Sequence, residues 1–509
     1  MFMKPILSAS SLALLVLLAG CAAGPDFKRP AVPEAKTYSP EAMPEATTSV
    51  SGFAGASQHF NPAADIPFDW WTLFQSPQIN SLIQRAFKAN PDIESAQAAL
   101  KQAQEYANAQ RGFFYPGVSA GYSASRNRIA GNMSSAAPGP QGNGDNLQAN
   151  PPKATYYNFH VAQLTVGYAP DVFGLNRRQV ESADALAAIQ KLQLEATYIT
   201  LGSNVVAAAI EEAALREEIT AEEKIVRSQQ DTLEILNNQS RLGYVSEMEV
   251  AAQESSLAIS QQSLIPLRTQ LERTRDLIRA LAGNTPDADV EEKFQLSSLH
   301  LPEELPLSLP SRIVEQRPDV RAAEEQLHYA SAQAGVAVAN TLPQFAITGA
   351  LGGMADTPDW MFRSGGGFFN LAASVSQTIF DGGTLRAQSR AAQQALIQAG
   401  AQYRSTVITA LQNVADTLYT LHADADMLKA ATVSAQATEK AANITRKQYQ
   451  LGYVNYQTQL AAEQAYQLSV INLIQAQTNR LGDTAILYQA LGGGWWNRSK
   501  ISPIQEAVQ

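Results

Sequence analysis

Two nearly identical pentapeptides decide the fold of this chain: RLGYV at residues 241–245 and QLGYV at 450–454, 209 positions apart. Each follows 63 residues that lack proline and are rich in Ala, Leu, Glu and Gln, at 177–239 and 386–448. At about 1.5 Å per residue, such a stretch forms a helix of roughly 95 Å, much longer than the helices of ordinary globular domains. Glycine can adopt the left-handed backbone that ends a helix. The sequence therefore predicts two long helices that each end in a Leu-Gly-Tyr-Val turn.

A second marker shows that these turns belong to an internal repeat. The segment NPDI at 90–93 matches RPDV at 317–320, in the same order relative to the turns. Self-similarity at a long period is the signature of repeated supersecondary units. We therefore expect two structural repeats, over residues 68–300 and 301–496.

Shorter helical segments accompany the long ones. In the first repeat these are 91–113 and 246–281, the latter with an expected kink at Pro266. Laid end to end they reach roughly 90 Å, close to the length of the long helix. Apolar residues on the long helix recur at spacings of three and four, as in Leu186, Ile189 and Leu192. This spacing favours coiled-coil packing of a long helix against a stacked pair of short ones.

Four segments alternate between apolar and small polar residues, the period of a β-strand. In the first, Val118, Ala120 and Tyr122 alternate with Ser119 and Gly121. The second changes phase halfway, and a β-bulge near Ala162 would reconcile its two parts. The four expected strands lie at about 115–126, 156–169, 342–353 and 367–380.

These strands and their flanks carry almost no charge. Four windows contain no Asp, Glu, Lys or Arg: 113–125, 154–170, 342–355 and 364–380. Lipid on one face of a sheet penalises charge, which favours membrane strands; an ordinary β-sandwich is the alternative. Four strands are too few to close a barrel, and open edges are not viable in lipid. The chain must then oligomerise: two copies give eight strands and three give twelve, and a conducting pore favours at least three.

Composition excludes several classes of function. The chain has 37 Lys and Arg against 47 Asp and Glu, a net charge of −10, which argues against a nucleic-acid partner. A single cysteine rules out a disulfide framework and a cysteine-based zinc site. The five histidines are scattered without close ligand spacing, and no phosphate-binding G-x-x-x-x-G-K-[ST] motif is present. We therefore expect no metal, no cofactor and no nucleotide hydrolysis.

One enzyme motif matches by spelling. Residues 117–121, GVSAG, fit G-x-S-x-G, the nucleophile elbow of a hydrolase. That elbow requires a sharp strand-to-helix turn, whereas here the strand alternation runs straight through the motif. We expect Ser119 to face a lumen, no catalytic residue, and no enzyme activity.

The single cysteine, Cys21, follows a short basic start and the apolar run 6–19. This pattern is typical of a secretory signal peptide, over residues 1–20, and the run is too short to span a membrane. The junction Leu18-Ala19-Gly20-Cys21 resembles the bacterial lipobox, which implies cleavage before Cys21 and its acylation, with palmitate as the expected lipid. Ordinary cleavage nearby is the alternative. Residues 21–67 then form an extended lead-in, and 497–509 a C-terminal tail.

Several motifs together resemble the TolC-like outer-membrane efflux proteins, and among them the acylated, OprM-like lipoproteins of RND-type efflux systems. The motifs are Cys21, WWTLF at 70–74, NPD at 90–92, DVFG at 171–174, FDGG at 380–383, the two LGYV turns and LGGGWW at 491–496. Each is weak alone, whereas their order and spacing over nearly the whole mature chain are specific.

The resemblance implies an α+β membrane protein with four strands per chain. Three chains would form a 12-stranded β-barrel in the outer membrane of a Gram-negative bacterium, continued by a long helical barrel across the periplasm. It also implies a periplasmic adaptor (membrane fusion) protein and an inner-membrane pump as partners. The positions that match the adaptor-binding tips are Leu242, Gly243, Tyr244, Val245, Leu451, Gly452, Tyr453 and Val454.

Members of this family often carry acidic residues beyond the second turn, where they line a gate. By register those positions are Thr458 and Ala461 here, and neither is acidic. Glu249 lies six residues after Gly243, as Thr458 does after Gly452, and is the nearest acidic candidate. Three such carboxylates around an axis would attract cations. Glu249 and Thr458 are therefore the predicted gate-lining positions.

The resulting interpretation is a passive exit duct for drugs or other small molecules, with energy supplied by the pump. Two other functions remain compatible with the sequence: a duct for type I protein secretion, and a structural lipoprotein that spans the periplasm without a pore. The charge-free strands argue against the second, and the acylation argues for efflux over secretion.

Overall fold

The computed structural model describes residues 22–31, 37–41, 43–130 and 154–500. The chain divides into two compact units. The sheet unit comprises residues 1–28, 102–187 and 326–399, and the helical unit comprises 29–101, 188–325 and 400–509. Among the described residues, no helix combines the length and the apolar character needed to cross a membrane.

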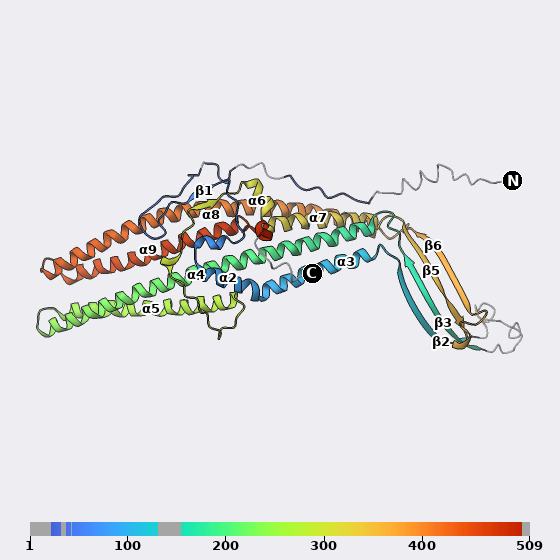
Figure 1. The fold of residues 1–509 in the computed structure, drawn as a ribbon, viewed down its shortest axis with the longest axis horizontal. Helices are drawn as coiled ribbons and strands as arrows, with labels where there is room; N and C mark the ends of the chain where they lie inside the picture. Colours follow the sequence, from blue (N-terminus) through green and yellow to red (C-terminus); the bar gives the residue numbers. More distant parts are fainter. Residues whose placement is uncertain (1–21, 32–36, 42, 131–153, 501–509) are drawn as a thin grey trace. The chain divides into compact units, whose positions relative to one another are not determined.

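Two long helices, α4 and α8, and several shorter ones make up most of the structure (Figure 1). The structure has α2 (Pro77–Ala89), α3 (Pro91–Gly112), α4 (Leu175–Arg241), α5 (Glu247–Leu281), α6 (Pro310–Gln316), α7 (Pro318–Ala339), α8 (Thr384–Gln450) and α9 (Tyr456–Ala490). Both α4 and α8 have 67 residues and therefore run for about 100 Å. Pro266 lies inside α5 without ending it.

Each long helix forms a hairpin with the helix that follows it. Between α4 and α5, Gln229 and Gln253 pair near the turn, and Ser263 donates to Glu222 over 2.5 Å further along. Between α8 and α9, Arg446 and Glu463 form an ion pair of 2.8 Å. Within each of the two hairpins, these contacts hold the two helices side by side and antiparallel.

The sheet unit holds β2 (Gly117–Ile129), β3 (Thr155–Tyr168), β5 (Gln344–Ala355) and β6 (Gly367–Ser376) in that spatial order, all antiparallel. The last strand ends before the expected residue 380, because Ser376 pairs with Gln344, the first residue of β5. The bulge expected near Ala162 is wrong, since the β2–β3 ladder continues through it residue by residue. Phe159 and Val161 lie on the opposite face of the sheet from Leu164, and Val161 is paired there with Met354 of β5.

The main core lies in the helical unit. Trp70 stacks on Tyr488 with ring centroids 5.1 Å apart, and both rings are buried. The short elements around this core are β1 (His59–Asn61), η1 (Trp70–Phe74), η4 (Leu296–Ser298), β4 (Glu304–Pro306) and η6 (Trp495–Lys500), with β1 and β4 paired in parallel; η5 (Pro358–Trp360) belongs to the sheet unit.

Candidate functional site

The two faces of the four-stranded sheet differ in chemistry. Residues paired across antiparallel strands share a face, so the register of the strands assigns each side chain to one face. One face is mainly apolar: Val118, Tyr122, Leu164, Val166, Phe345, Ile347, Leu351, Phe369, Leu371 and Val375. The other carries mainly small or polar residues: Ser119, Gly121, Ser123, Gln163, Thr165, Thr348, Asn370 and Ser374.

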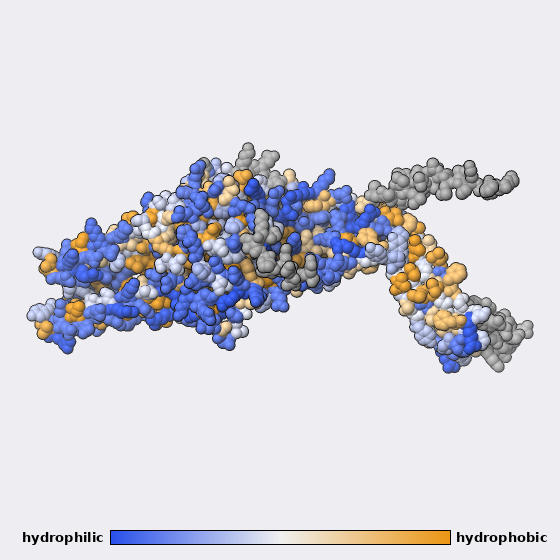
Figure 2. Space-filling view, in the orientation of Figure 1, coloured by the Kyte–Doolittle hydropathy of each residue, from blue (hydrophilic) through white to orange (hydrophobic). Residues whose placement is uncertain are grey.

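The apolar face is exposed in the single chain. Phe369 and Leu371 are 86% and 78% exposed, and Figure 2 shows hydrophobic colour gathered over the strands. A continuous exposed apolar surface marks contact with a partner or with lipid. Strands β3, β5 and β6 and residues 117–125 of β2 carry no Asp, Glu, Lys or Arg, and only the far end of β2 is charged, with Arg126 and Arg128. This low charge favours lipid as the contact for the apolar face.

The G-x-S-x-G match has no elbow geometry. Residues 117–121 lie in β2 with unbroken pairing to β3, and Ser119 pairs with Thr165 on the polar face. Ser119 therefore has the geometry of an ordinary strand residue. Within the described ranges, no three His, Cys, Asp or Glu side chains group closely enough to hold a metal ion.

The two helix tips have the same backbone geometry. Gly243 and Gly452 have φ values of 76° and 75°. Tyr244 N–H donates to the carbonyl of Gln239 and Gly243 N–H to that of Ser240, both at 2.9 Å. The second tip repeats both bonds at 2.9 Å, from Tyr453 to Gln448 and from Gly452 to Tyr449. Both are Schellman turns, which require the left-handed glycine.

The tips expose apolar side chains. Leu242, Tyr244, Leu451 and Tyr453 are exposed, whereas Val245 and Val454 are half-buried. Each tip therefore presents one leucine and one tyrosine on a rigid turn. Such a pair is suited to contact with another protein, since aromatic anchors on rigid backbones dominate protein–protein contacts.

The predicted gate positions have local roles at the start of the returning helices. Glu249 completes a capping box at the start of α5: Ser246 N–H donates to its carboxylate at 3.0 Å, and the Ser246 hydroxyl accepts from Glu249 N–H. Thr458 plays the matching part in α9, where Asn455 Oδ1 accepts from its N–H at 3.0 Å. Glu249 also lies close enough to Tyr449 to contribute, after burial, to the raised pKa of that phenol.

A buried polar network near the tips joins the two hairpins. The Tyr456 hydroxyl on α9 donates to Gln253 on α5, and both side chains are at most 2% exposed. Gln253 then donates to the carbonyl of Gln229 at 2.8 Å, and Gln229 donates to Gln467 at 3.3 Å. The sequence analysis missed this network, because no motif distinguishes these residues from the many other Gln residues of the helices. The contacts tie the first hairpin to the second.

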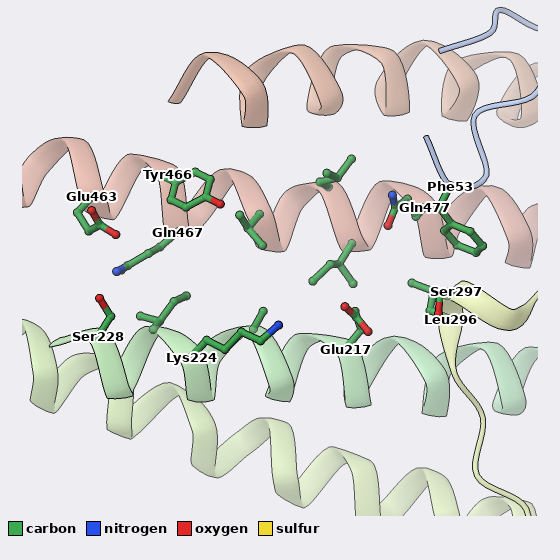
Figure 3. Close-up of a pocket in the computed structure, with 15 residues that line it drawn as sticks. Phe53, Glu217, Lys224, Ser228, Leu296, Ser297, Glu463, Tyr466, Gln467 and Gln477 are labelled. Carbon is green, nitrogen blue, oxygen red and sulfur yellow. The ribbon is translucent and has the colours of Figure 1, made fainter. Parts of the chain in front are cut away.

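A groove of about 490 Å³ lies between α4 and α9 in the helical unit. In Figure 3, Lys224 and Glu217 of α4 lie across the groove from Tyr466 and Gln467 of α9, and Phe53 lies at one end. Its lining includes the apolar side chains of Ile225, Val470 and Ile474. The groove has the size of a small-ligand pocket but no cluster of reactive groups.

The chain next to Cys21 is fixed to the sheet unit, although Cys21 itself lies outside the described residues. Ala23 N–H donates to the carbonyl of Phe173 at 2.9 Å. The Arg178 guanidinium is almost fully buried and pairs with Asp26 at 2.6 Å and with Glu181 at 2.7 Å. Hydrogen bonding and charge from these two carboxylates raise the pKa of Arg178 against the effect of burial. Residues 22–26 are thus held at the turn between β3 and α4.

Comparison with known proteins gives a consistent result. A model of the family described as outer membrane efflux protein matches residues 82–284 and 309–493. The chain is 25% identical over 507 residues to the probable efflux pump outer membrane protein TtgC of Pseudomonas putida, and the match covers 99% of each chain. It is 28% identical over 439 residues to the pyoverdine export outer membrane protein OpmQ of Pseudomonas aeruginosa, covering 85% of this chain and 88% of the relative. The solved structure of the outer-membrane channel OprN superposes with a TM-score of 0.81 at 24% identity, over 93% of this chain and 100% of that one.

Proposed function

Because the chain belongs to the outer membrane efflux protein family, we propose that it is the exit duct of an efflux system, carrying small molecules passively across the periplasm and the outer membrane. Its fold is that of the TolC-like channels, and its place is the outer membrane. One observation carries the proposal: a sheet with an exposed apolar face stands on the same chain as two helical hairpins with matching exposed tips. The family model matches the chain in two blocks, 82–284 and 309–493, which supports the proposed repeats 68–300 and 301–496.

The duct is a homotrimer. Within the described residues, β2 pairs only with β3, and β6 only with β5, so each sheet has two open edges. An open edge carries unpaired backbone N–H and C=O groups, which lipid cannot hydrogen-bond. Edge strands from other copies of the chain pair with these groups. Eight strands leave an interior filled by side chains, whereas twelve leave room for a water-filled path. The polar face with Ser119 and Ser123 lines that path.

The partners are a periplasmic adaptor protein and an inner-membrane pump. The chain has no motif for nucleotide hydrolysis, so the energy for export comes from the pump. The adaptor binds the tips at 242–245 and 451–454, whose leucine and tyrosine side chains are exposed. Its binding favours the state in which the two hairpins have moved apart.

Retention of a fluorescent cationic dye tests the function. Cells with the gene deleted, and with sibling ducts deleted as well, are compared with the same cells carrying the restored gene. We expect deletion to raise retained dye several-fold and the intact gene to reverse it. Equal retention in both strains contradicts small-molecule export; loss of a secreted protein instead would assign the duct to protein secretion.

The lipid anchor is at Cys21. Residues 22–26, which follow Cys21 directly in the sequence, are held at the β3–α4 turn, and this supports an acyl anchor at Cys21. We expect radiolabelled palmitate to mark the wild-type chain and not Cys21→Ser. A wild-type chain that stays unlabelled, or a labelled Cys21→Ser chain, contradicts this anchor.

The Glu249 carboxylate lines the closed end of the duct. Glutamine also serves in a capping box, so Glu249→Gln removes the charge while keeping the start of α5 intact. We expect thermal stability close to wild type and a several-fold fall in cation selectivity of the open channel. Glu247→Gln, an exposed carboxylate in the same helical turn, is the matched control. Unchanged selectivity in Glu249→Gln contradicts the role.

A further inference from the structure

Two arginines at one end of β2 interrupt the low charge of the four-stranded sheet. Strands β2, β3, β5 and β6 contain no Asp, Glu or Lys, and no Arg except Arg126 and Arg128. Both arginines are exposed. β2 begins at Gly117, five residues after the end of α3, so the two arginines lie at the end of the strand that is far from this helix. No carboxylate of the four strands is available to neutralise them.

The register places both arginines on the apolar face of the sheet. Successive residues of a strand alternate between the two faces, so Arg126 and Arg128 share the face of Val118 and Tyr122. Ser119 lies on the other, polar face. An arginine on that face would meet the water of the proposed duct, whereas an arginine on the apolar face of a barrel meets the membrane. Two positive charges on this side of the sheet therefore require a partner that the membrane itself supplies.

The length of β2 brings the arginines to the level of the lipid headgroups. Arg111 of α3 is the last charged residue before β2, so the apolar band starts near Gly117. From Gly117 to Arg126, nine steps of about 3.3 Å give roughly 30 Å along the strand. A barrel strand tilted by about 35–45° converts this into roughly 21–25 Å of height, which matches the apolar band of about 25 Å in outer-membrane barrels. Arg126 then lies at the edge of the band, and Arg128 just beyond it.

The side chains beside the arginines are those of a membrane interface. Arg126 is paired with Asn158 and Arg128 with Tyr156, all on the same face. The Arg128 guanidinium lies over the Tyr156 ring, 5.8 Å from its centroid. Tyr122, four residues before Arg126 on this face, is also exposed. Tyrosine is enriched where a membrane meets water, so this face changes from apolar to interfacial at the arginines.

We propose that Arg126 and Arg128 bind the phosphate groups of an outer-leaflet lipid, a doubly phosphorylated glycolipid of the lipid A type. A guanidinium donates two parallel hydrogen bonds to a phosphate, which is the strongest pairing available to an arginine at a surface. The Cα atoms of the two arginines are about 6–7 Å apart, because the residues are two steps apart on one strand. Two guanidinium groups so placed match a headgroup with two phosphates better than one with a single phosphate.

The rest of the apolar face fits the same lipid. Below the arginines, the acyl chains lie along the apolar side chains of the face, which include Val118 and Leu164. The inference rests on the proposed function, because it requires a barrel whose helices lie in the periplasm and whose far end reaches the outer leaflet. The two arginines do not line the proposed path, so lipid binding and export can be measured separately.

Native mass spectrometry of the purified full-length oligomer tests the lipid site. The protein in mild detergent is titrated with doubly phosphorylated lipid A, with lipid A freed of its phosphates, and with phosphatidylglycerol. The test variant combines Arg126→Gln with Arg128→Gln, which removes both charges and keeps long polar side chains. Arg363→Gln is the matched control, since Arg363 is an exposed arginine of the same sheet unit whose guanidinium lies 3.9 Å from the Asp359 carboxylate.

We expect wild type and Arg363→Gln to bind doubly phosphorylated lipid A at least tenfold more tightly than the other two lipids. The double glutamine variant loses this preference, and its affinity for lipid A falls at least tenfold. A second variant with lysine at both positions keeps the charge without the fork of donors and falls between the two. Added salt weakens the binding to wild type, because the interaction is between exposed charges.

Two outcomes overturn the lipid site alone. One is equal affinity of wild type and the double glutamine variant for lipid A, and the other is equal affinity of wild type for lipid A and phosphatidylglycerol. Dye retention in cells carrying the same variants separates the lipid site from the proposed function, since the double glutamine variant is expected to export like wild type. A wild-type chain that binds no lipid and exports no dye overturns the barrel, and the lipid site with it.

Discussion

Leu371→Arg is expected to prevent assembly of the chain in the outer membrane. Leu371 lies on the apolar face of β6, opposite Gly349, and is 78% exposed. An arginine in the lipid-facing band of a barrel costs about 2–4 kcal/mol at the membrane centre. In a trimer this cost arises three times, and the total is comparable to the whole free energy of unfolding of an ordinary domain.

The neighbouring residue provides the control for this variant. Asn370 pairs with Ala350 and points to the polar face, because successive strand residues alternate. Asn370→Arg is therefore expected to assemble normally. Oligomer bands on unheated gels and membrane fractionation measure both variants. Normal assembly of Leu371→Arg would show that this face does not contact lipid.

Replacing Gly243 and Gly452 together by valine is expected to reduce export to the level of the deletion strain. An added Cβ meets nothing within 4 Å at either glycine, so the effect is backbone strain and not a clash. A left-handed backbone costs a residue with a side chain about 1–2 kcal/mol, and more for a β-branched one. Both Schellman turns then rearrange, and the exposed leucines and tyrosines lose their positions.

Asparagine at the same two positions is the matched control, because it tolerates the left-handed backbone. The double asparagine variant should retain most export, while both variants should assemble in the membrane like wild type. Dye retention and co-purification with the adaptor measure the outcome. Full export by the double valine variant would show that the shape of the tips is not used.

Local patterns account for what the sequence predicted correctly. Proline-free stretches and apolar spacing predict α4 and α8, because helix formation depends on near neighbours, and period-two alternation predicts the strands of the sheet. The resemblance to TolC-like efflux proteins is confirmed by the family match. The prediction of a bulge at Ala162 was wrong because two apolar residues of β3, Phe159 and Val161, lie on the otherwise polar face of the sheet. Their pairing with the neighbouring strands cannot be read from the sequence of β3 alone.

Contacts between distant residues could not be predicted from the sequence. Arg480 meets Thr47 across 433 positions, and Tyr456 meets Gln253 across 203. Each of these residues is unremarkable in its own helix, and only the packing of the hairpins brings the partners together. The local capping role of Glu249, in contrast, follows from the spacing of Ser246 and Glu249, which is that of a capping box.

Unitary conductance of the purified full chain in planar bilayers tests most directly whether this chain alone builds a water-filled path. Wild type is compared with Tyr456→Phe, which removes the hydrogen bond to Gln253 between the hairpins. The proposed duct predicts stepwise ohmic currents without a nucleotide or a pump, and more frequent open steps in Tyr456→Phe. Membranes that contain inserted oligomers of both proteins yet show no steps would contradict a duct.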